Sequence, residues 1–561
     1  MYMLKKFFAA ALASAFSLLF AATAAAELPM LKFVDGGRAR LYVDGKPFLV
    51  LGGELQNSSG STVEDMQRLW GKLKSQNLNT VLIAVPWRLV EREEGKFDFS
   101  YFTEIIAQAK RLDMKLVPLW FGAWKNGVSG YAPEWAMKDS RFKKMKTADG
   151  KTLPILSNIC PNVRAADKRA FVEFMKAIRA ADPDGKTVIM VQIENEMGLL
   201  GGATRDFSPE AQKLFAQPVP QKLAEFVVKN ADKLSPEIAS AWRERGSKTS
   251  GTWEELFGQG KNLADEMFMA WQYARYVDDL AKAGKTVHNL PMFVNAWLHS
   301  PTSLPGKYPS GGPNARVLDV WVAAAENVDF FSPDNYSSKY KETLRTFMRH
   351  GNPIFVPEAL KRGASARAFY TMGDGAIGFS PFAIDFDYPN TLDSIGNAYA
   401  ALANIAPEII ACDGTKNMRG FMYQGDKTET LDFGDFTVEI EYADKFEGYG
   451  LIIRLSEEEF LLAGSCVRVV FISNDKSKPL VELGIVEEGY FENEDACLFG
   501  KIFGCDSAGR KWHITRYIGG DETTRRDGRG KGVFLPPELS FRGVCDPAKV
   551  SIIKARVFKM E

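Results

Sequence analysis

Eight short apolar segments, separated for the most part by helical patterns, dominate the sequence between residues 48 and 380. Short runs of β-branched and apolar residues that are bounded by turn residues are typical of buried strands. Strands that alternate with helices form parallel sheets, and eight such units close into a (β/α)8 barrel. The segments span residues 48–54, 79–85, 115–121, 187–198, 291–297, 328–336, 353–358 and 375–380.

A doubly wound open sheet is the alternative arrangement of alternating strands and helices. Nucleotide-binding sheets of this kind carry a Gly-rich phosphate loop, G-x-G-x-x-G, after the first strand. The first segment here ends in Gly52-Gly53-Glu54, which does not match that loop. The sequence therefore favours a closed barrel over residues 27–412. The predicted barrel contains a helical insertion at about residues 199–285. This segment is longer than an ordinary strand-to-helix connection.

After residue 412 the pattern changes. Over residues 436–442 apolar and polar side chains alternate, and Gly, Asp and Asn cluster between this and later segments of the same kind. Such alternation predicts antiparallel strands, and so an all-β, sandwich-like domain over residues 413–561. Glycan-binding domains need exposed aromatic platforms, and Trp512 is the one Trp in this region. We therefore expect the domain to brace the barrel.

The N-terminus has the pattern of a secretory signal peptide, which we predict to span residues 1–26. Lys5 and Lys6 precede an apolar stretch at residues 7–20, and a small-residue cleavage site follows at Ala24-Ala25-Ala26. The mature protein is then expected in the periplasm or outside the cell. The alternative interpretation is an uncleaved membrane anchor. No other segment is apolar enough to span a bilayer, so we expect no integral membrane segment after cleavage.

Composition excludes several classes of partner. The 70 basic and 70 acidic residues cancel, which argues against nucleic acid as the main partner. The six cysteines form no C-x-x-C pair, which argues against a zinc site. Four of them lie after residue 460, where a disulfide and buried free thiols are both consistent with the sequence. The oligomeric state is not set by these features.

The predicted strand ends bring carboxylate, amide and aromatic side chains to one face of the barrel. The nearest histidine is His299, just past the fifth strand, so a Ser-His-Asp hydrolase lacks its base and a His-based metal site lacks its ligands. We expect chemistry by carboxylates, without a metal or organic cofactor. The residues at the strand ends are Glu54, Gln56, Trp87, Arg88, Trp120, Trp124, Asn195, Glu196, Asn295, Trp297, Asp334, Asn335, Tyr336 and Glu358.

Two carboxylates across a cleft suit glycoside hydrolysis, in which one donates a proton and the other is ionised. Glu196 and Glu358 end the fourth and seventh predicted strands, on opposite sides of the barrel mouth. Tyr336 and Arg88 are expected to keep Glu358 ionised. Glu194 competes with Glu196, because strand alternation predicts that both fall on the same face.

The motif Gln192-Ile-Glu-Asn-Glu-Met-Gly198 resembles the Q-x-E-N-E-Y-G signature of glycoside hydrolase family 35, the β-galactosidases of a large (β/α)8 glycosidase clan. The likeness extends over roughly residues 30–410, including the run from Trp87 to Ser100. It implies that Glu196 is the acid/base, that Asn195 contacts the sugar 2-hydroxyl, and that Glu358 is the nucleophile. Met197 stands where that signature has Tyr, and the first and third strand ends also differ from the family's forms.

The resemblance implies an exported retaining exo-β-galactosidase that acts on terminal β-galactosides of oligo- or polysaccharides. The alternatives are another glycosidase of the clan, such as a β-glucosidase, β-mannosidase or arabinosidase, and a catalytically inactive glycan-binding protein. Nitrophenyl glycosides would separate the sugars, and binding without turnover would indicate the inactive protein. The predicted substrate contacts are Asn195, Tyr336, Glu54, Arg88, Trp120, Trp124, Asn295 and Trp297.

Overall fold

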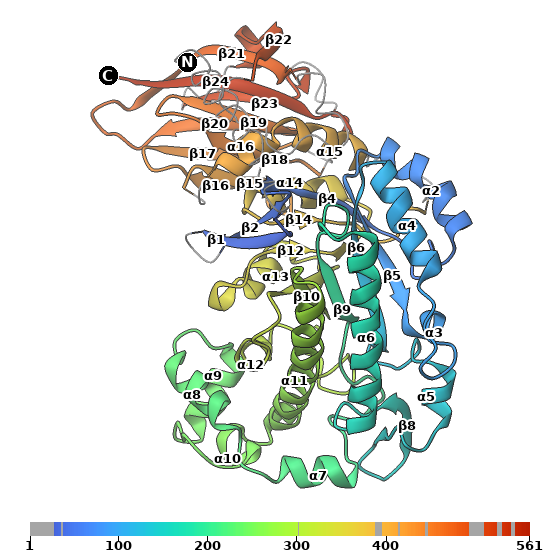
Figure 1. Ribbon diagram of the computed structural model, residues 1–561. Helices are drawn as coiled ribbons and strands as arrows, with labels where there is room; N and C mark the ends of the chain where they lie inside the picture. Colours follow the sequence, from blue (N-terminus) through green and yellow to red (C-terminus); the bar gives the residue numbers. More distant parts are fainter. Residues whose placement is uncertain are drawn as a thin grey trace, which may run out of the picture.

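The computed structural model describes residues 27–34, 38–300, 302–386, 395–412, 416–443, 447–492, 510–523, 530–539 and 545–561. It consists of a parallel barrel surrounded by helices, followed by two larger antiparallel sheets (Figure 1). The antiparallel sheets lie at one end of the molecule, and the helices of residues 209–257 lie at the other. The predicted signal peptide lies outside the described residues.

Nine parallel strand segments form the barrel, in the order β12-β14-β4-β5-β6-β9-β10-β11-β13. The two end segments are consecutive in the chain and are separated only by Pro357, which has no N–H to donate to a ladder. Because β12 pairs with β14 and β13 pairs with β11, they act as one strand and close the predicted eight-stranded barrel. The bounds are β4 Val50–Glu54, β5 Thr80–Pro86, β6 Lys115–Lys125, β9 Val191–Asn195, β10 Met292–Trp297, β11 Phe330–Asn335, β12 Phe355–Val356, β13 Glu358–Ala359 and β14 Gly378–Phe379.

Amphipathic helices cover the outside of the barrel. In α6, for example, Val163, Phe171, Phe174 and Ile178 follow a helical spacing and are all fully buried. The helices are α2 Val63–Ser75, α3 Trp87–Val90, α4 Ser100–Arg111, α5 Glu134–Lys138, α6 Pro161–Ala181, α12 Leu318–Ala324, α13 Tyr340–Phe347, α14 Ala364–Gly373, α15 Ile395–Asn404 and α16 Ala406–Ala411. A small hairpin, β7 Lys144–Lys146 and β8 Thr152–Leu156, precedes α6.

The segment between β9 and β10 is helical, as expected from the sequence. Its last helix, α11, is the longest described and packs beside α6 with most of its apolar side chains buried (Figure 1). The other helices of the segment are short, and two of them begin at a Ser cap followed by Pro. The bounds are α7 Pro209–Phe215, α8 Gln221–Lys229, α9 Pro236–Glu244, α10 Trp253–Phe257 and α11 Leu263–Val287.

A three-stranded antiparallel sheet closes the bottom of the barrel. It consists of β1 Met30–Val34, β2 Arg38–Val43 and β3 Lys46–Phe48, and Asp44 and Gly45 turn the chain between the last two with positive φ. Its buried apolar side chains join the cluster inside the barrel, formed by alternate residues of the parallel strands. The opposite end of the barrel, where the parallel strands finish, is left for polar side chains.

The C-terminal region forms the predicted antiparallel sandwich. Its two sheets have the orders β15-β18-β19-β24-β21-β22 and β16-β17-β20-β23. Apolar residues of both sheets interleave in one buried cluster, because alternate residues of each strand face inward. The bounds are β15 Met418–Met422, β16 Thr428–Asp432, β17 Phe436–Tyr442, β18 Tyr449–Arg454, β19 Glu459–Ser465, β20 Val467–Ser473, β21 Leu480–Phe491, β22 Trp512–Tyr517, β23 Lys531–Leu535 and β24 Ser551–Met560.

The strands β18 and β19 of the six-stranded sheet are buried on both faces. One face packs on the four-stranded sheet, and Leu451 and Leu461 of the other face belong to the cluster that contains the barrel helices. At this junction Gly373 of α14 faces Gly420 of β15 so closely that a Cβ on Gly373 would lie 2.3 Å from the Gly420 backbone. A contact this close needs glycine on both sides. This packing fits the expected bracing role.

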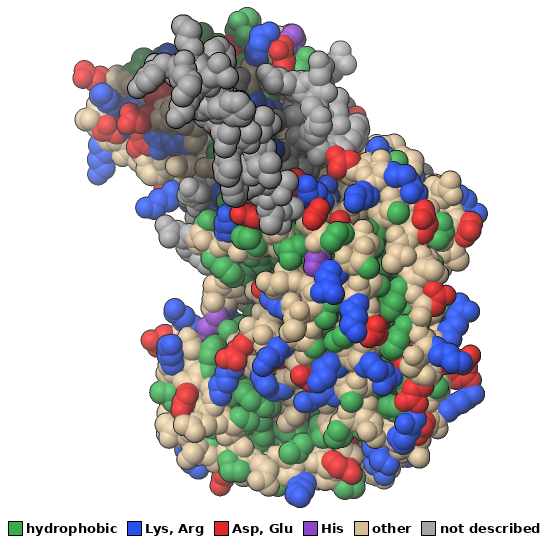
Figure 2. Space-filling model, in the orientation of Figure 1, with side chains coloured by type: hydrophobic (Ala, Val, Ile, Leu, Met, Phe, Trp, Pro, Cys, Tyr) green, Lys and Arg blue, Asp and Glu red, His purple; other side chains and the backbone are tan. Residues whose placement is uncertain are grey.

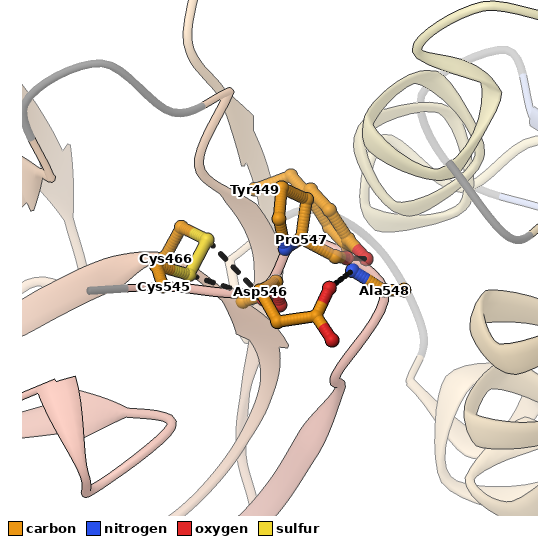
Figure 3. Close-up of a disulfide and its surroundings, with 7 residues drawn as sticks. Tyr449, Cys466, Cys545, Asp546, Pro547 and Ala548 are labelled. Atoms are coloured by element: carbon orange, nitrogen blue, oxygen red, sulfur yellow. Dashed lines mark hydrogen bonds between the residues drawn. A yellow bond between two sulfur atoms is a disulfide. The ribbon is translucent and has the colours of Figure 1, made fainter. Parts of the chain in front are cut away.

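A disulfide between Cys466 and Cys545 ties the sandwich to the segment that leads into β24 (Figure 3). The carbonyl of Asp546 accepts from the Ser465 hydroxyl at 3.2 Å. The next carbonyl, of Pro547, accepts from the Tyr449 hydroxyl at 2.7 Å. Of the two interpretations that the sequence left open for the late cysteines, the structure therefore contains a disulfide.

Replacing Cys545 by Ser is expected to lower the melting temperature of the purified protein. The bond closes a loop of 79 residues, and the loss of that constraint on the unfolded chain corresponds to about 4 kcal/mol. Differential scanning calorimetry measures the change, with the Cys466→Ser/Cys545→Ser double variant as the control that should match the single variant. An unchanged melting temperature would mean that the bond does not stabilise the fold.

The molecular surface carries charges of both signs. Lys and Arg side chains alternate with Asp and Glu over the visible face of the barrel, with no large patch of one sign (Figure 2). This distribution agrees with the zero net charge of the sequence. Among the described residues, no helix combines the length and apolar character that crossing a membrane requires.

Candidate active site

Three buried carboxyl groups meet where the parallel strands end. Glu196 follows β9, Asp334 lies in β11, and Glu358 begins β13. One oxygen of each carboxyl lies within 4.8 Å of an oxygen of the other two. Their exposed fractions are 5%, 1% and 6%, so the three groups share a site largely shielded from solvent. The sequence predicted Glu196 and Glu358 at strand ends on opposite sides of the barrel mouth and gave no role to Asp334, whereas the structure brings all three together.

Glu358 is held by one oxygen and free at the other. The Tyr336 hydroxyl donates to its Oε1, so Tyr336 contacts Glu358 as expected from the sequence. Its Oε2 is buried and has no hydrogen-bond partner among the described residues. Burial and the charge of Glu358 raise the pKa of Tyr336 above its usual range, so the phenol remains a donor. Glu358 therefore keeps one buried carboxyl oxygen without a hydrogen-bond partner in the described chain, beside Glu196 and Asp334.

Asn295 of β10 forms hydrogen bonds that hold both Glu196 and Asp334 in place. Its Oδ1 accepts from the backbone N–H of Glu196 at 2.9 Å. Its Nδ2 donates to Asp334 Oδ2 at 2.8 Å and to Asn195 Oδ1 at 3.2 Å. With its oxygen bonded in this way, Asn195 leaves its own Nδ2 buried without a partner in the described chain. A buried unpartnered donor is costly unless a ligand accepts from it.

The electrostatics of the cluster favour a protonated Glu196. Burial and the nearby charge of Glu358 raise the pKa of Glu196 to about 7, against an opposing effect of Lys125. Burial, together with the charges of the neighbouring glutamates, raises the pKa of Asp334 well above its usual range. Burial and the charge of Glu358 do the same for Glu54. Like charges this close cannot all ionise, so protons remain in the cluster at neutral pH.

The value of kcat/KM is expected to fall as the pH rises through about 7, if Glu196 must donate a proton in the first step. The protonated form predominates below its pKa of about 7 and is lost above it, so the rate should decline about tenfold per pH unit on the alkaline side. A pH–rate profile with an aryl glycoside measures this limb. An activity that stays constant to pH 9 would rule out Glu196 as the titrating acid.

Glu194 does not share the face of Glu196, which corrects the prediction from strand alternation. The backbone of Glu194 has φ of +59° and that of Glu196 has φ of +44°, so the regular alternation of a strand ends before them. The Glu194 side chain turns into the protein and accepts from the backbone N–H groups of Ala123 at 3.1 Å and Trp124 at 2.8 Å. Glu196 alone of the two faces the cleft.

The predicted sugar contacts of Trp120 and Trp124 are also corrected. Both side chains are fully buried on the outer side of β6 and pack among the helices. Trp120 Nε1 donates to Asp167 of α6 at 2.9 Å, and the Trp124 ring contacts Tyr276 edge-on at 5.0 Å between ring centres. The residues of β6 that face the barrel interior are the alternate ones, so these two indoles cannot stack on a sugar.

Arg88 does not contact Glu358, which corrects its expected role. Its guanidinium is exposed, donates to the Gly130 carbonyl at 2.9 Å and lies over the Tyr131 ring. The cation that interacts with Glu54 and Glu196 is Lys125, at the end of β6, and no role was expected for it from the sequence. Glu54 is buried at the end of β4 as predicted, and Trp297 lies at the end of β10 with 38% of its surface exposed.

Among the described residues, Glu196, Asp334 and Glu358 form the one group whose oxygens lie close enough to share a metal ion. A set of carboxylate oxygens suits a hard cation such as Ca²⁺ or Mg²⁺ when the groups are ionised. Here the raised pKa values of Glu196 and Asp334 favour carboxyls that carry protons. The arrangement is therefore better suited to proton transfer and nucleophilic attack.

Residues 59–376, more than half of the 561-residue chain, match the sequence model of glycoside hydrolase 42, described as β-galactosidase. The chain belongs to this β-galactosidase family. The predicted clan of (β/α)8 glycosidases is thereby confirmed, while the narrower prediction of family 35 stays a prediction. Residues 395–527 match a second model, a domain of unknown function that covers much of the sandwich.

Curated β-galactosidases resemble part of this chain. It is 29% identical over 168 residues to β-galactosidase-1-like protein 3 of Mus musculus, covering 29% of this chain and 24% of that protein. It is 28% identical over 191 residues to a β-galactosidase of Xanthomonas manihotis, covering 32% of this chain and 29% of that protein. The matches therefore span only about a quarter of these curated relatives.

Solved β-galactosidase structures resemble this chain weakly. The enzyme of Bacillus circulans sp. alkalophilus has a TM-score of 0.43 at 13% identity, over 64% of this chain and 56% of that chain. The enzyme of Rahnella sp. R3 has a TM-score of 0.44 at 15% identity, over the same shares.

Proposed function

We propose that this protein is a retaining exo-β-galactosidase that hydrolyses terminal β-galactosides by a double displacement on Glu196 and Glu358. The observation that carries the proposal is the approach of the two glutamates to within 4.8 Å between oxygens. Retaining glycosidases hold their two carboxyls about 5–5.5 Å apart, whereas inverting enzymes leave about 6.5–9.5 Å for a water. Membership of a β-galactosidase family supports both the reaction and the sugar.

In the first displacement, Glu358 Oε2 attacks the anomeric carbon while Glu196 gives its proton to the leaving oxygen. The Tyr336 hydroxyl donates to Oε1 of Glu358, so Oε2 is the oxygen available for the attack. In the second displacement, ionised Glu196 takes a proton from water, and the water replaces Glu358 at the anomeric carbon. The raised pKa of Glu196, about 7, suits both roles, because the group can donate and accept near neutral pH.

The amide of Asn195 supplies a donor for the glycone. Its unpartnered Nδ2 is buried beside the catalytic pair and suits the 2-hydroxyl of the sugar. Asn295 fixes this amide and the backbone of Glu196 together. A hydrogen bond to the 2-hydroxyl strengthens in the transition state and contributes to catalysis as well as binding.

A panel of nitrophenyl glycosides tests the proposal. We expect β-galactoside to be cleaved with the highest kcat/KM, and α-galactoside not to be cleaved. A preference for β-glucoside, β-mannoside or an arabinoside would indicate the alternative sugar specificity with the same chemistry. Binding of galactose without cleavage of any glycoside would indicate the glycan-binding alternative.

The proposal includes export to the periplasm or the medium, on the basis of the charged and apolar pattern of residues 1–26. We expect the mature chain to begin near Glu27. N-terminal sequencing of protein from fractionated cells measures this start. A chain that keeps residues 1–26 in the cytosolic fraction would contradict the export proposal without affecting the catalytic one.

A further inference from the structure

Lys125 is a buried cation inside the candidate active site. It ends β6, opposite Asn195 of the neighbouring strand. Its side chain turns inward over the ring of Phe121, with Nζ 4.8 Å from the ring centre, and Phe121 belongs to the cluster inside the barrel. Only 7% of the residue is exposed. The ammonium therefore lies inside the barrel near the ends of β6 and β9, close enough to Glu54 and Glu196 to affect their ionisation.

The ammonium of Lys125 has no hydrogen-bond or ion-pair partner among the described residues. Within the described part of the chain it forms no ion pair within 4.0 Å and no side-chain hydrogen bond, although an ammonium offers three donors. Two other buried cations of the described chain are paired: Arg205 contacts Asp265 at 2.9 Å, and Arg316 contacts Glu266 at 3.3 Å. Burial of an unpaired charge is costly, and such a charge marks a position that a ligand completes.

The carboxyls nearest to Lys125 do not use its donors. Glu54 and Glu196 interact with it only at longer range. Burial favours the protonated form of Glu54, and Glu358 already has the Tyr336 hydroxyl as its donor. A positive charge with free donors therefore remains beside the space in which the glycone lies against the catalytic pair.

We propose that Lys125 binds an anionic substituent of the glycone, so that the substrates are acidic β-galactosides that carry a carboxylate or a sulfate ester. This inference rests on the proposed function, because it assigns the chemical class of sugar to the same site. An ammonium beside an anionic oxygen forms a charge-assisted hydrogen bond, and the enclosed position protects that bond from screening by salt. A neutral sugar leaves the buried charge without its counter-ion.

Binding of free monosaccharides tests the inference without requiring turnover. Calorimetry with the wild-type protein should give Kd values for galacturonate or galactose 6-sulfate about 10- to 100-fold lower than for galactose. The two acidic sugars distinguish a carboxylate from a sulfate ester as the recognised group. Lys125→Met should abolish this preference, Lys125→Arg should keep part of it, and Lys138→Met, which removes an exposed charge of α5, should leave it intact.

Kinetics separate failure of this inference from failure of the proposed function. The ratio of kcat/KM for nitrophenyl β-galacturonide, or for the 6-sulfated galactoside, to that for the neutral β-galactoside should fall about 10- to 100-fold in Lys125→Met. Tighter binding of galactose than of both acidic sugars, or an unchanged ratio in a folded Lys125→Met protein, would overturn the inference. Absence of cleavage of every β-glycoside would instead contradict the proposed function, and the binding measurement would still decide the role of Lys125.

Discussion

Replacing Glu358 by Ala is expected to lower kcat for nitrophenyl β-galactoside by about 10⁴-fold or more, because no covalent glycosyl-enzyme can then form. The fold should survive, since among the described residues the side chain of Glu358 has one hydrogen bond, from Tyr336, and its other oxygen has no partner. Initial rates from wild type and variant measure the loss, and circular dichroism checks the fold.

Added azide should restore turnover of the Glu358→Ala variant and yield the α-glycosyl azide. The small anion occupies the space of the lost carboxylate and attacks the anomeric carbon from the same side, with Glu196 still available to protonate the leaving group. Glu194→Ala is the matched control, because that glutamate lies two residues before Glu196 but faces the protein interior. A Glu358→Ala variant with near-wild-type activity would exclude this nucleophile.

Replacing Glu196 by Ala should slow the cleavage of substrates with poor leaving groups by about 10²- to 10⁴-fold, which is the usual contribution of a general acid. Dinitrophenyl glycosides need little protonation, so their first step should be nearly unaffected and the glycosyl-enzyme should accumulate. A plot of rate against leaving-group pKa measures this difference. The alkaline limb near pH 7, assigned to Glu196, should disappear from the profile of the variant.

Azide should also rescue the Glu196→Ala variant, but through the opposite stereochemistry. It replaces water in the second displacement and gives the β-glycosyl azide, because Glu358 still forms the intermediate. The pair of azide products therefore assigns the two glutamates independently. An equal loss of rate for all leaving groups would mean that Glu196 does not act as the general acid.

The barrel was predictable because each strand carries its own local signal. Segments such as residues 79–85 and 115–121 are apolar runs between turns, and all eight of these runs are strands of the barrel. The positions of Glu54, Glu196 and Glu358 follow from the rule that parallel strands end on one face. The sandwich was predictable for the same reason, from the strict alternation of residues 436–442.

The orientation of individual side chains was not predictable, because it depends on the backbone at the strand ends. The positive φ of Glu194 reverses its direction, and no sequence pattern marks that conformation for Glu. Trp120 lies on the outer side of β6, where an aromatic residue at a strand end fills the helix layer.

Contacts between distant segments carried no local signal either. In the sequence, Asp334 is one of several residues at a strand end. Only the folded structure shows that Asn295 holds it beside Glu196. Cys466 meets Cys545 because β19 and β24 are neighbours in the sheet, and sequence spacing does not define that order. Such pairings follow from the whole fold.

The assignment of Glu358 as nucleophile is tested most directly by trapping the intermediate. A 2-deoxy-2-fluoro-β-galactosyl fluoride should inactivate the protein, because the fluorine slows the second displacement more than the first. Digestion and mass spectrometry should then place the fluorosugar on the peptide that contains Glu358 and on no other. A label on Glu54, Glu196 or Asp334, or turnover of β-galactosides without any trapped intermediate, would contradict the account.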